Sequence, residues 1–560
     1  MKRVSVCRLS LLFLCCGMAI TASAQTLTTI ANFNSADGDV PKASLVQGID
    51  GNYYGTTFQG GANYSQYCFG LGCGTVFQVT SAGTLTTIYS FCVEYRCSDG
   101  ANPSTAMSLV NDGSLYGTTP GTIFQVNPDG TLTTFLHLCC TTYGGVIQGV
   151  DRNFYGTTSD GGNRDCNDGY GCGTVYKVTP TGVVTTLHAF DGTDGSFPHA
   201  GLTQAHDGDF YGTTFEGTEN CRVSGGCGSV FRISPTDDFT VLHSFDCDND
   251  GANPEGTLIE SADGNLYGTT AFGCGKAGGG TVFRITPAGV FTTLYRFCSI
   301  VNCPDGLQPD AGVIQATDGN FYGTTTHGGD PSCQYYGCGT LFKLTPAGVL
   351  TTLHAFCPQQ NCPDGDFPFG GLIQATDGKL YGTTADGGIY NAGTIFAVDL
   401  ALDPFVSLIR DSGKVSGIGG ILGQGFAGTT SVSLNGTPAK FKVISDTFIR
   451  AQVPNGATTG FVSVTTPSGT LTSNKVFRVR PQLLSFDPPS GPVGTQVTIT
   501  GVSLTQTQGV GFGNRVPAQF TVNSDTQVTA TVPSGAKTGK VGIQTKGGTA
   551  ISSGTFTVTQ

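Results

Sequence analysis

The tetrapeptide Tyr-Gly-Thr-Thr occurs seven times in this chain, and no other feature constrains the fold as strongly. The copies are separated mostly by about 56 residues, and they begin at Tyr54, Tyr116, Tyr155, Tyr211, Tyr267, Tyr322 and Tyr381. Repetition at such a period indicates an array in which each unit is one supersecondary structure that buries its apolar face against its neighbours.

Each copy lies in a longer frame that contains four short apolar segments. In the sixth copy, residues 312–325 hold two segments joined by Asp318-Gly-Asn320, and residues 339–356 hold two more joined by Pro346-Ala-Gly348. Short turns with Gly between such segments are typical of β-hairpins. Four antiparallel strands per unit are typical of one blade of a β-propeller.

The two ends of the repeat region complement each other. The seventh copy continues through Gly393-Thr-Ile-Phe396 and then lacks its fourth strand, whereas residues 26–33 match that missing strand. An N-terminal strand that completes the last blade would close the ring and remove exposed sheet edges. We therefore predict an all-β chain with a seven-bladed β-propeller over residues 25–402.

The repeat unit also resembles a known family. The segment Asp-Gly-Asn-x-Tyr-Gly-Thr-Thr, followed by Gly-Thr-Val-Phe, is similar to the tandem repeat of bacterial "choice-of-anchor" GloVer-repeat proteins, over about two thirds of the chain. The resemblance implies an extracytoplasmic location and provides no catalytic or binding residue. This chain departs from the family in ending with other domains where an anchor would be expected.

The residues after the repeats form a different region. The run from Leu483 to Gly501 and the segment Ala530 to Gly539 resemble an IPT/TIG domain, an immunoglobulin-like β-sandwich, over residues 481–560. Residues 403–480 resemble a second, weaker copy, in which Ala451 to Gly460 parallels the later segment. The resemblance implies spacers or interaction modules in a secreted protein.

The first 24 residues are predicted to be a secretory signal peptide. Basic residues at Lys2, Arg3 and Arg8 precede an apolar stretch, and Ala22-Ser-Ala24 offers small residues for cleavage. Cleavage changes the formal net charge from −12 to −15, because three basic residues and no acidic ones are lost. This charge disfavours nucleic acids and anionic membranes as partners. No later apolar stretch has the length of a transmembrane helix, so we expect a secreted, periplasmic or cell-surface protein.

Eighteen cysteines follow residue 24, and all of them precede residue 363. In an exported chain an even number of cysteines in closely spaced pairs predicts local disulfides. The predicted pairs are Cys68–Cys73, Cys92–Cys97, Cys166–Cys172, Cys221–Cys227, Cys247–Cys274, Cys298–Cys303, Cys333–Cys338 and Cys357–Cys362. Zinc is the alternative, but it needs two pairs that converge, and these pairs are expected to be spread around the ring. The adjacent Cys139 and Cys140 are compatible with a disulfide, a redox site or two separate bonds.

Strand alternation predicts that all long connections share one end of the ring. If the tight hairpins lie at one end, the cysteine-rich loops and the Asp-Gly-x-x-Pro turns must lie at the other. These turns begin at Asp37, Asp99, Asp194, Asp250, Asp305 and Asp364. Variable loops on a rigid scaffold are a common binding surface, although the loops are also explained by the need for order outside the cell. Only Pro120 stands where other repeats insert a loop, which predicts a low wall beside the second and third blades.

One loop has the pattern of a calcium site. Asp246, Asp248 and Asp250 match the opening Asp-x-Asp-x-Asp-Gly of a calcium-binding loop, in which alternating carboxylates converge on one hard cation. Thr257 stands where the twelfth residue, normally Glu, is expected. Calcium is thus the one cofactor that the sequence suggests, and a solvated acidic turn is the alternative.

Residues that recur in every repeat are expected to be architectural. This applies to the signature Tyr and Thr residues and to His188, His243 and His354, although seven equal sugar pockets of a lectin are an alternative. One position of the first strand is occupied by Gln in most repeats and by Glu260 in the fifth. We expect these amides to satisfy backbone groups between blades, with Glu260 as the better functional candidate.

The sequence contains no recognisable catalytic motif. His-Glu-x-x-His, Gly-x-Ser-x-Gly and phosphate-loop patterns are all missing. We therefore predict a monomeric, non-catalytic binding or adhesion protein that contacts an extracellular protein or glycan through its loop face. The alternatives are a secreted propeller enzyme that acts on polysaccharide, and a structural envelope or matrix protein. Carboxylates clustered in a deep central pocket would favour the enzyme.

Overall fold

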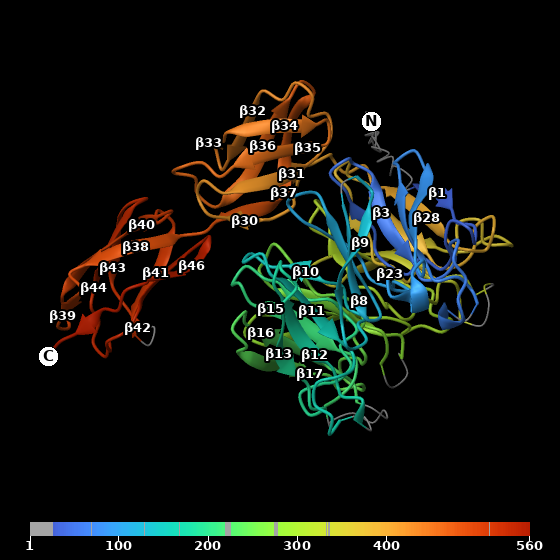
Figure 1. Ribbon diagram of the computed structural model, residues 1–560, viewed down its shortest axis with the longest axis horizontal. Coiled ribbons are helices and arrows are strands. Elements are labelled where there is room, and N and C mark those ends of the chain that lie inside the picture. The colour runs from blue at the N-terminus through green and yellow to red at the C-terminus, as the bar shows by residue number, and fades with distance from the viewer. Residues whose placement is uncertain are drawn as a thin grey trace, which may run out of the picture.

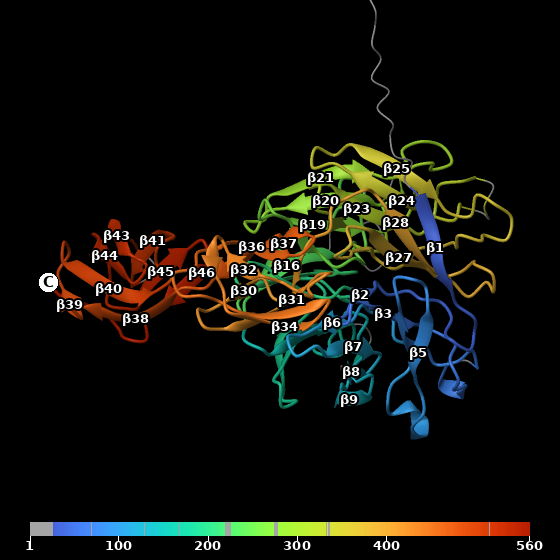
Figure 2. The same ribbon diagram turned by 90° about the horizontal axis from the view of Figure 1, so that it is seen from above.

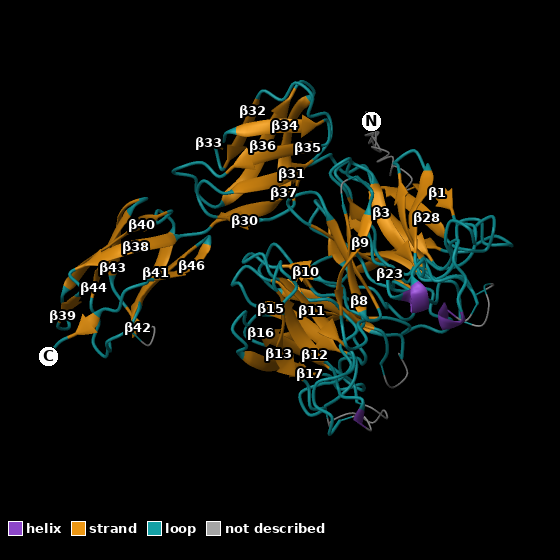
Figure 3. Ribbon diagram, in the orientation of Figure 1, coloured by secondary structure: helices purple, strands orange, loops and turns teal. Residues whose placement is uncertain are grey.

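The computed structural model describes residues 26–560 apart from residues 69, 128, 167–168, 219–225, 274–277, 332, 334–335 and 514–515. The predicted signal peptide therefore lies outside the described residues. The described part of the chain is almost entirely β (Figure 3), and the helical segments in it are short 3₁₀ turns, among them Gln66–Cys68 and Tyr95–Cys97.

The described residues as far as Asp399 form seven four-stranded antiparallel sheets, numbered here 1 to 7. Sheets 1 to 3 contain β2 (Val46–Gln47), β3 (Tyr53–Thr57), β4 (Thr75–Val79), β5 (Leu85–Ser90); β6 (Ser108–Leu109), β7 (Leu115–Thr119), β8 (Thr122–Val126), β9 (Leu132–His137); and β10 (Ile147–Gln148), β11 (Phe154–Thr158), β12 (Thr174–Val178), β13 (Val184–Ala189). Sheets 4 to 6 contain β14 (Thr203–Gln204), β15 (Phe210–Thr214), β16 (Ser229–Ile233), β17 (Phe239–Ser244); β18 (Ile259–Glu260), β19 (Leu266–Thr270), β20 (Thr281–Ile285), β21 (Phe291–Arg296); and β22 (Ile314–Gln315), β23 (Phe321–Thr325), β24 (Thr340–Leu344), β25 (Leu350–Ala355).

Sheet 7 is completed by the beginning of the chain. It contains β26 (Ile373–Gln374), β27 (Leu380–Thr384), β28 (Thr394–Asp399) and β1 (Thr26–Asn32). β1 pairs antiparallel with β28 from Thr26 opposite Asp399 to Asn32 opposite Thr394, and the two strands lie side by side in Figure 1. The predicted completion of the last sheet by the N-terminal strand is therefore observed.

The signature tetrapeptide forms the second strand of each sheet, and its glycine makes room for an aromatic ring. In sheet 4, Gly212 lies opposite Phe231 of β16, and a Cβ added to Gly212 would lie 2.5 Å from the Phe231 ring. Close-packed interiors do not tolerate such an overlap. The glycine is thus needed for packing inside the sheet.

The signature tyrosine holds the hairpin that precedes it. The hydroxyl of Tyr211 donates a hydrogen bond to the carboxylate of Asp207 at 2.7 Å. The same bond is made by Tyr54, Tyr155, Tyr267, Tyr322 and Tyr381 to Asp50, Asp151, Asp263, Asp318 and Asp377. Six of the seven signature tyrosines therefore have the expected structural role.

The first threonine of the signature links each sheet to the next. Thr157 of sheet 3, for example, donates from its hydroxyl to the carbonyl oxygen of Ala200 in sheet 4 at 3.1 Å. The equivalent bonds run from Thr56, Thr118, Thr269, Thr324 and Thr383 to the carbonyl oxygens of Thr105, Gly144, Ala311, Gly370 and Ala43. Between sheets 4 and 5 the hydroxyl of Thr203 donates to the carbonyl oxygen of Leu258 instead. Because Thr383 belongs to sheet 7 and Ala43 leads into sheet 1, the sheets follow one another round a ring.

Two further pairs of sheets follow the ring and have the same strand order. The first pair consists of β29 (Ser407–Leu408), β31 (Ile418–Leu422), β35 (Phe448–Gln452), β34 (Phe441–Ser445), and of β30 (Ser412–Gly413), β37 (Gly469–Val479), β36 (Gly460–Thr466), β32 (Ser431–Leu434), β33 (Thr437–Pro438). The second consists of β38 (Gln482–Asp487), β40 (Gln496–Val502), β44 (Gln527–Thr531), β43 (Phe520–Ser524), and of β42 (Val516–Pro517), β41 (Thr507–Phe512), β45 (Val541–Thr545), β46 (Gly548–Ile551), with the short pair β39 (Ser490–Gly491) and β47 (Thr557–Val558). Each pair encloses its own apolar core. We call them the first and second sandwich.

The first sandwich lies between the ring and the second sandwich (Figure 2). The hydroxyl of Thr447 donates to the carbonyl oxygen of Ile49 in sheet 1 at 2.8 Å. The amide of Phe405 donates to the carbonyl oxygen of Thr376 in sheet 7 at 3.1 Å. Arg410 reaches Gln148 of sheet 3, and Arg478 lies 3.6 Å from Glu260 of sheet 5. Since these contacts involve four sheets spread round the ring, the first sandwich lies across the end that carries the tight hairpins.

Candidate functional site

A cavity of about 500 Å³ lies at the centre of the ring, at the end opposite the first sandwich. It is lined by the short segments that lead into β2, β6, β10, β14, β18, β22 and β26, so all seven sheets contribute. Its volume is in the usual range of ligand pockets, about 300–1,000 Å³.

One position of the repeat contributes a different side chain to this cavity from every sheet. In six repeats this position is the residue after the proline of the Asp-Gly-x-x-Pro turn. Sheet 3 lacks the turn, and there the equivalent residue is Tyr143, which precedes Gly144, the residue whose carbonyl oxygen accepts the bond from Thr118. These residues, which we call the cavity ring, are Lys42, Ser104, Tyr143, His199, Glu255, Asp310 and Phe369. The turns are evident in the sequence, but the position after them was not predicted to be a site. The feature that could have revealed this position is that its residue differs in every repeat, whereas the residues around it are largely the same.

The cavity ring has a charged side, formed by sheets 1, 5 and 6. Burial and the neighbouring carboxylate of Asp310 raise the pKa of Glu255 to about 8, and the Lys42 ammonium opposes this shift. Burial also raises the pKa of Asp310, against the hydrogen bond from Thr326 and the charge of Lys42. The two carboxyl groups therefore retain a proton at pH values where a free Glu would be ionised.

Lys42 is held in place by two aromatic rings. Its Nζ lies 4.8 Å from the ring centroid of Phe58 and 5.2 Å from that of Phe369. A lysine ammonium over an aromatic face gains about 0.5–2 kcal/mol. Lys42 is thus fixed beside the carboxyl pair, and its charge also opposes the rise in the pKa of Asp386 that burial causes.

The opposite side of the cavity ring is aromatic and neutral. The imidazole of His199 stacks on Phe215 with 4.4 Å between centroids, and the ring of Tyr143 meets it edge-on at 5.2 Å. Burial lowers the pKa of His199 to about 4. The imidazole is therefore uncharged near neutral pH and offers one donor and one acceptor. The cavity thus suits a polar ligand with groups for both hydrogen bonding and stacking.

The glutamines of the first strand serve the joints between sheets. The Nε2 of Gln204 donates to the carbonyl oxygen of Gly208 in its own turn at 2.9 Å, and its Oε1 accepts from the amide of Val150 at 2.9 Å. Gln47, Gln315 and Gln374 make corresponding bonds. The expected role in satisfying backbone groups between sheets is therefore observed.

Glu260 holds a network that includes the first sandwich. Its carboxylate accepts hydrogen bonds from the backbone amide and the ring of His206, and Arg478 lies 3.6 Å away and 3.2 Å from Asp411. Burial raises the pKa of Glu260, but the bonds from His206 and the charge of Arg478 outweigh it, so the pKa is lowered. The charge of Glu260 thus belongs to the contact between domains and not to the cavity.

Two of the three carboxylates of the predicted calcium loop, those of Asp246 and Asp250, accept hydrogen bonds from the loop and the strand before it. Asp250 accepts from Nε2 of His243 at 2.7 Å and from the amide of Asp246 at 2.6 Å, and Asp246 accepts from the amide of Asp248 at 3.1 Å. The His243–Asp250 bond recurs as His188–Asp194 and His354–Asp364, each at 2.7 Å. Asp250 therefore has the same architectural role as its counterparts. Calcium binding stays a prediction, and it would require these bonds to be exchanged.

Six of the predicted disulfides lie within the described residues and are present. They are Cys68–Cys73, Cys92–Cys97, Cys166–Cys172, Cys298–Cys303, Cys333–Cys338 and Cys357–Cys362. Cys227 and Cys247 are also disulfide-bonded, and their predicted partners Cys221 and Cys274 lie outside the described residues.

The cysteine pairs are less dispersed than the sequence suggested. The Sγ atoms of Cys68, Cys73, Cys92 and Cys97 all lie within 4.8 Å of one another, because the two loops of sheet 1 meet. The expectation that no two pairs converge was therefore wrong. Both pairs are closed as disulfides, and a sulfur in a disulfide is not the thiolate that zinc requires.

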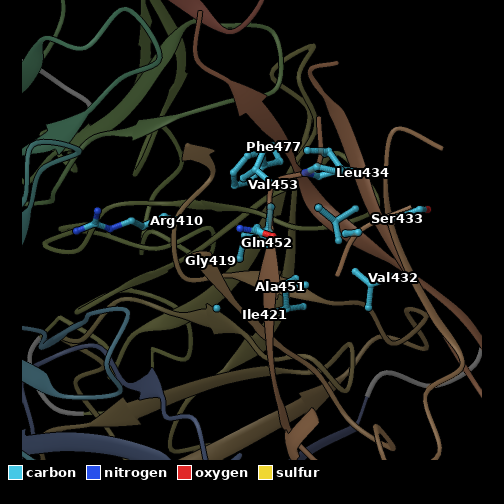
Figure 4. Close-up of a pocket in the computed structure, with 15 residues that line it drawn as sticks. Arg410, Gly419, Ile421, Val432, Ser433, Leu434, Ala451, Gln452, Val453 and Phe477 are labelled. Atoms are coloured by element: carbon cyan, nitrogen blue, oxygen red, sulfur yellow. The ribbon is translucent and has the colours of Figure 1, made fainter. Parts of the chain in front are cut away.

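A second, much smaller cavity lies inside the first sandwich. Its volume is about 40 Å³, and Ile421, Val453 and Phe477 are among the apolar side chains that line it. Arg410 extends away from these side chains in Figure 4, toward its contact with Gln148. This cavity has room for little more than one water molecule, so we regard it as a packing gap between two sheets.

Comparison with known families identifies the repeat region and the second sandwich. The sequence profile of the Gloeobacter/Verrucomicrobia repeat matches residues 17–138, 119–333 and 299–425, and that of the IPT/TIG domain matches residues 481–559. No curated protein matches the sequence.

Several solved structures are distantly similar. A streptogramin B lyase is 15% identical, with 67% of this chain and 97% of the lyase covered and a TM-score of 0.45. The extracellular domain of a hybrid two-component system from B. thetaiotaomicron is 14% identical, with 95% and 57% covered and a TM-score of 0.43. A fungal alcohol oxidase of the AA5 family, in complex with copper, is 13% identical, with 96% and 99% covered and a TM-score of 0.41. TM-scores this low do not bear on function.

The IPT/TIG domain and the disulfides mark the protein as extracytoplasmic. Separately, the described residues contain no helix with the length and apolar character needed to span a membrane.

Proposed function

The chain belongs to the Gloeobacter/Verrucomicrobia repeat family, and we propose that it binds a ligand in the central cavity of a seven-bladed β-propeller. The observation that carries this proposal is the cavity ring. Its seven members occupy one position of the repeat, whereas their side chains are all different. Architecture needs the same residue in every repeat, as the signature tyrosines show, so the variation is better explained by an asymmetric ligand.

We propose a division of the chain into four parts, the first from the sequence alone and the other three in agreement with the sheets. Residues 1–24 are the signal peptide, residues 25–402 the propeller closed by its N-terminal strand, and residues 403–480 and 481–560 two IPT/TIG-like sandwiches. The bond from Thr383 to Ala43, which joins sheet 7 to sheet 1, supports the closed ring. The repeated strand order supports two sandwiches.

The ligand enters from the loop end of the ring. The first sandwich lies across the hairpin end, where it contacts sheets 1, 3, 5 and 7. At the loop end, β7 and β8 are joined by Pro120-Gly121 alone, and the connection after β9 is short. The wall is therefore low next to Tyr143, on the aromatic side of the cavity. The concave shape of the cavity favours a glycan segment or another small polar molecule over a protein surface, and the protein acts as a monomer.

A glycan array with the full mature chain tests this proposal. His199→Ala removes the stacked imidazole and should abolish binding to any glycan that the wild type retains. Tyr95→Ala is the matched control, because Tyr95 is 81% exposed on a loop outside the cavity. If Tyr95→Ala loses binding and His199→Ala keeps it, the ligand binds the loop surface and the proposal fails. If the protein binds no glycan on the array and captures one envelope protein instead, a glycan is excluded as the ligand of the cavity.

One observation favours the enzyme as a second candidate. Glu255 and Asp310 face the same cavity, and near neutral pH Glu255 keeps its proton whereas Asp310, with a pKa of about 6, is mostly ionised. The pair thus offers the one acid and the one carboxylate that hydrolysis of a glycosidic bond needs. Incubation with a panel of polysaccharides should then release reducing ends. Glu255→Gln and Asp310→Asn should both stop the release, whereas Glu94→Gln, at an exposed loop position, should not. Binding without cleavage by the wild type would leave only the binding function.

A further inference from the structure

Cys139 and Cys140 are the two cysteines of the described chain that are free. They lie in the connection that leaves β9 of sheet 2 and leads to Tyr143 of the cavity ring. Their Sγ atoms are 3.0 Å apart, with Cys139 exposed and Cys140 partly buried.

The connection has close counterparts in three other sheets. The amide of Leu138 donates to the carbonyl oxygen of Gly121, as the amide of Phe91 donates to that of Gly74. Phe297 and Phe356 make the same bond to Gly280 and Gly339. Cys139 therefore occupies the place of the cysteine that follows each phenylalanine. These are Cys92, Cys298 and Cys357, and each forms a disulfide with the cysteine five positions later.

In sheet 2 this connection is shorter, and the second cysteine is adjacent to the first. Its backbone is fixed at the next residues, because the amide of Thr141 donates to Asp160 at 2.7 Å and the hydroxyl of Thr142 donates to the carbonyl oxygen of Thr157 at 2.8 Å. The side chain of Cys140 lies against Gly161, where an added Cβ would be 2.4 Å from its Sγ. The thiols are thus held together by the fold.

We propose that Cys139 and Cys140 form a reversible vicinal disulfide, the shortened counterpart of the staples in sheets 1, 5 and 6. The oxidant is a disulfide, either of an oxidoreductase or of a small thiol. The thiolate of Cys139 attacks one sulfur of that disulfide and displaces a thiolate, which leaves a mixed disulfide on Cys139. The thiolate of Cys140 then attacks the Cys139 sulfur and displaces the second thiolate. The pair loses two protons and two electrons, and the oxidant becomes two thiols.

The order of attack follows from exposure. Cys139 is open to an incoming disulfide, whereas burial, the bond with Cys139 and the charge of Asp160 raise the pKa of Cys140 to about 12. Exposed disulfides are reduced more readily than structural ones. This pair is therefore the labile one, and it lies beside Tyr143 at the low wall of the cavity. The inference does not depend on the proposed ligand.

The state of the pair is measured on the wild-type chain, exported to an oxidising compartment and purified without reductant. After denaturation and alkylation, mass spectrometry of the peptide with both cysteines should show no alkyl group and a mass lower by two hydrogens than the dithiol. A thiol–disulfide buffer of rising reducing strength should open this pair before Cys92–Cys97. Cys139→Ser and Cys140→Ser should each expose one alkylatable thiol.

Three results would overturn the proposal. They are alkylation of both cysteines in the untreated protein, linkage of either cysteine to a different one, and reduction of the pair only together with the other disulfides. Because the wild-type protein is measured first, misfolding of a variant does not affect the outcome.

Discussion

At the scale of single residues, the repeat contains positions that make the same contact in most sheets and positions whose side chain changes from sheet to sheet. The hydroxyl of a signature tyrosine finds the same carboxylate in sheet after sheet, whereas the residue after the turn proline changes from Lys42 to Glu255 to Phe369. The constant residue therefore makes a contact inside its sheet, whereas the variable one lines the cavity that the sheets share.

The tyrosine bond can be tested with an internal control. Tyr211→Phe removes the donor to Asp207 and should lower the free energy of unfolding by about 1–2 kcal/mol. Tyr116→Phe should change it by less than about 0.5 kcal/mol, because the Tyr116 hydroxyl has no hydrogen-bond partner among the described residues. Urea denaturation of both variants measures the difference. Equal losses would contradict a stabilising role for the bond.

The carboxyl pair makes stability depend on pH. The pKa of Glu255 is about 8 in the folded chain and 4.5 ordinarily. Its folded form thus keeps a proton that the unfolded form releases, so the stability is full below pH 4.5 and declines as the pH rises through 8. Glu255→Gln removes this decline. The free energy of unfolding of the variant minus that of the wild type should therefore increase by about 1–3 kcal/mol from about pH 4 to about pH 9. Thermal unfolding at both pH values measures it, with Glu94→Gln as an exposed control that should keep the wild-type slope.

At the scale of elements, the N-terminal strand decides whether the ring closes. β1 supplies the fourth strand of sheet 7, and the residue after it, Phe33, is fully buried and donates from its amide to the carbonyl oxygen of Gly393. Its ring packs edge-on against Phe77 of sheet 1, with 4.9 Å between centroids. One residue thus joins the last sheet to the first.

Phe33→Ala should therefore destabilise the chain by about 3–5 kcal/mol, since it leaves a cavity at the joint. Phe461→Ala removes the same side chain from a position that is 49% exposed in the first sandwich, and it should cost less than about 1 kcal/mol. Guanidinium denaturation of the two variants compares these losses. Similar midpoints would show that the N-terminal closure contributes little.

At the scale of the whole molecule, the first sandwich is positioned by a few polar contacts. Arg478 bridges Glu260 of the ring and Asp411 of the sandwich, and Thr447 reaches the hairpin of sheet 1. Glu260 also raises the pKa of His206 through their hydrogen bond, against the effect of burial. The docking of the sandwich is thus coupled to the joint between sheets 4 and 5.

Arg478→Ala should loosen this docking. Hydrogen exchange at the amide of Phe405, which donates to the carbonyl oxygen of Thr376 in sheet 7, should become at least tenfold faster. This corresponds to a decrease of about 1.4 kcal/mol in the free energy of local opening. Lys442→Ala, at an exposed position of the same sandwich, should leave the rate unchanged. An unchanged rate in Arg478→Ala would show that the other contacts hold the first sandwich without Arg478.

The sequence alone determined what depends on neighbours along the chain. Four strands per repeat, the hairpin turns, the missing strand supplied by residues 26–33 and the cysteine pairs five or six residues apart are all local patterns, because strand period, turn chemistry and short disulfide loops act over a few residues. The tertiary structure decided what depends on ring closure. Glu255 and Asp310 are a full repeat apart in sequence, and they meet only because each sheet is turned toward the same axis. The convergence of two cysteine pairs depends on how two loops of sheet 1 pack, and the contact of Glu260 with Arg478 depends on how the first sandwich docks, and no local pattern encodes either of them.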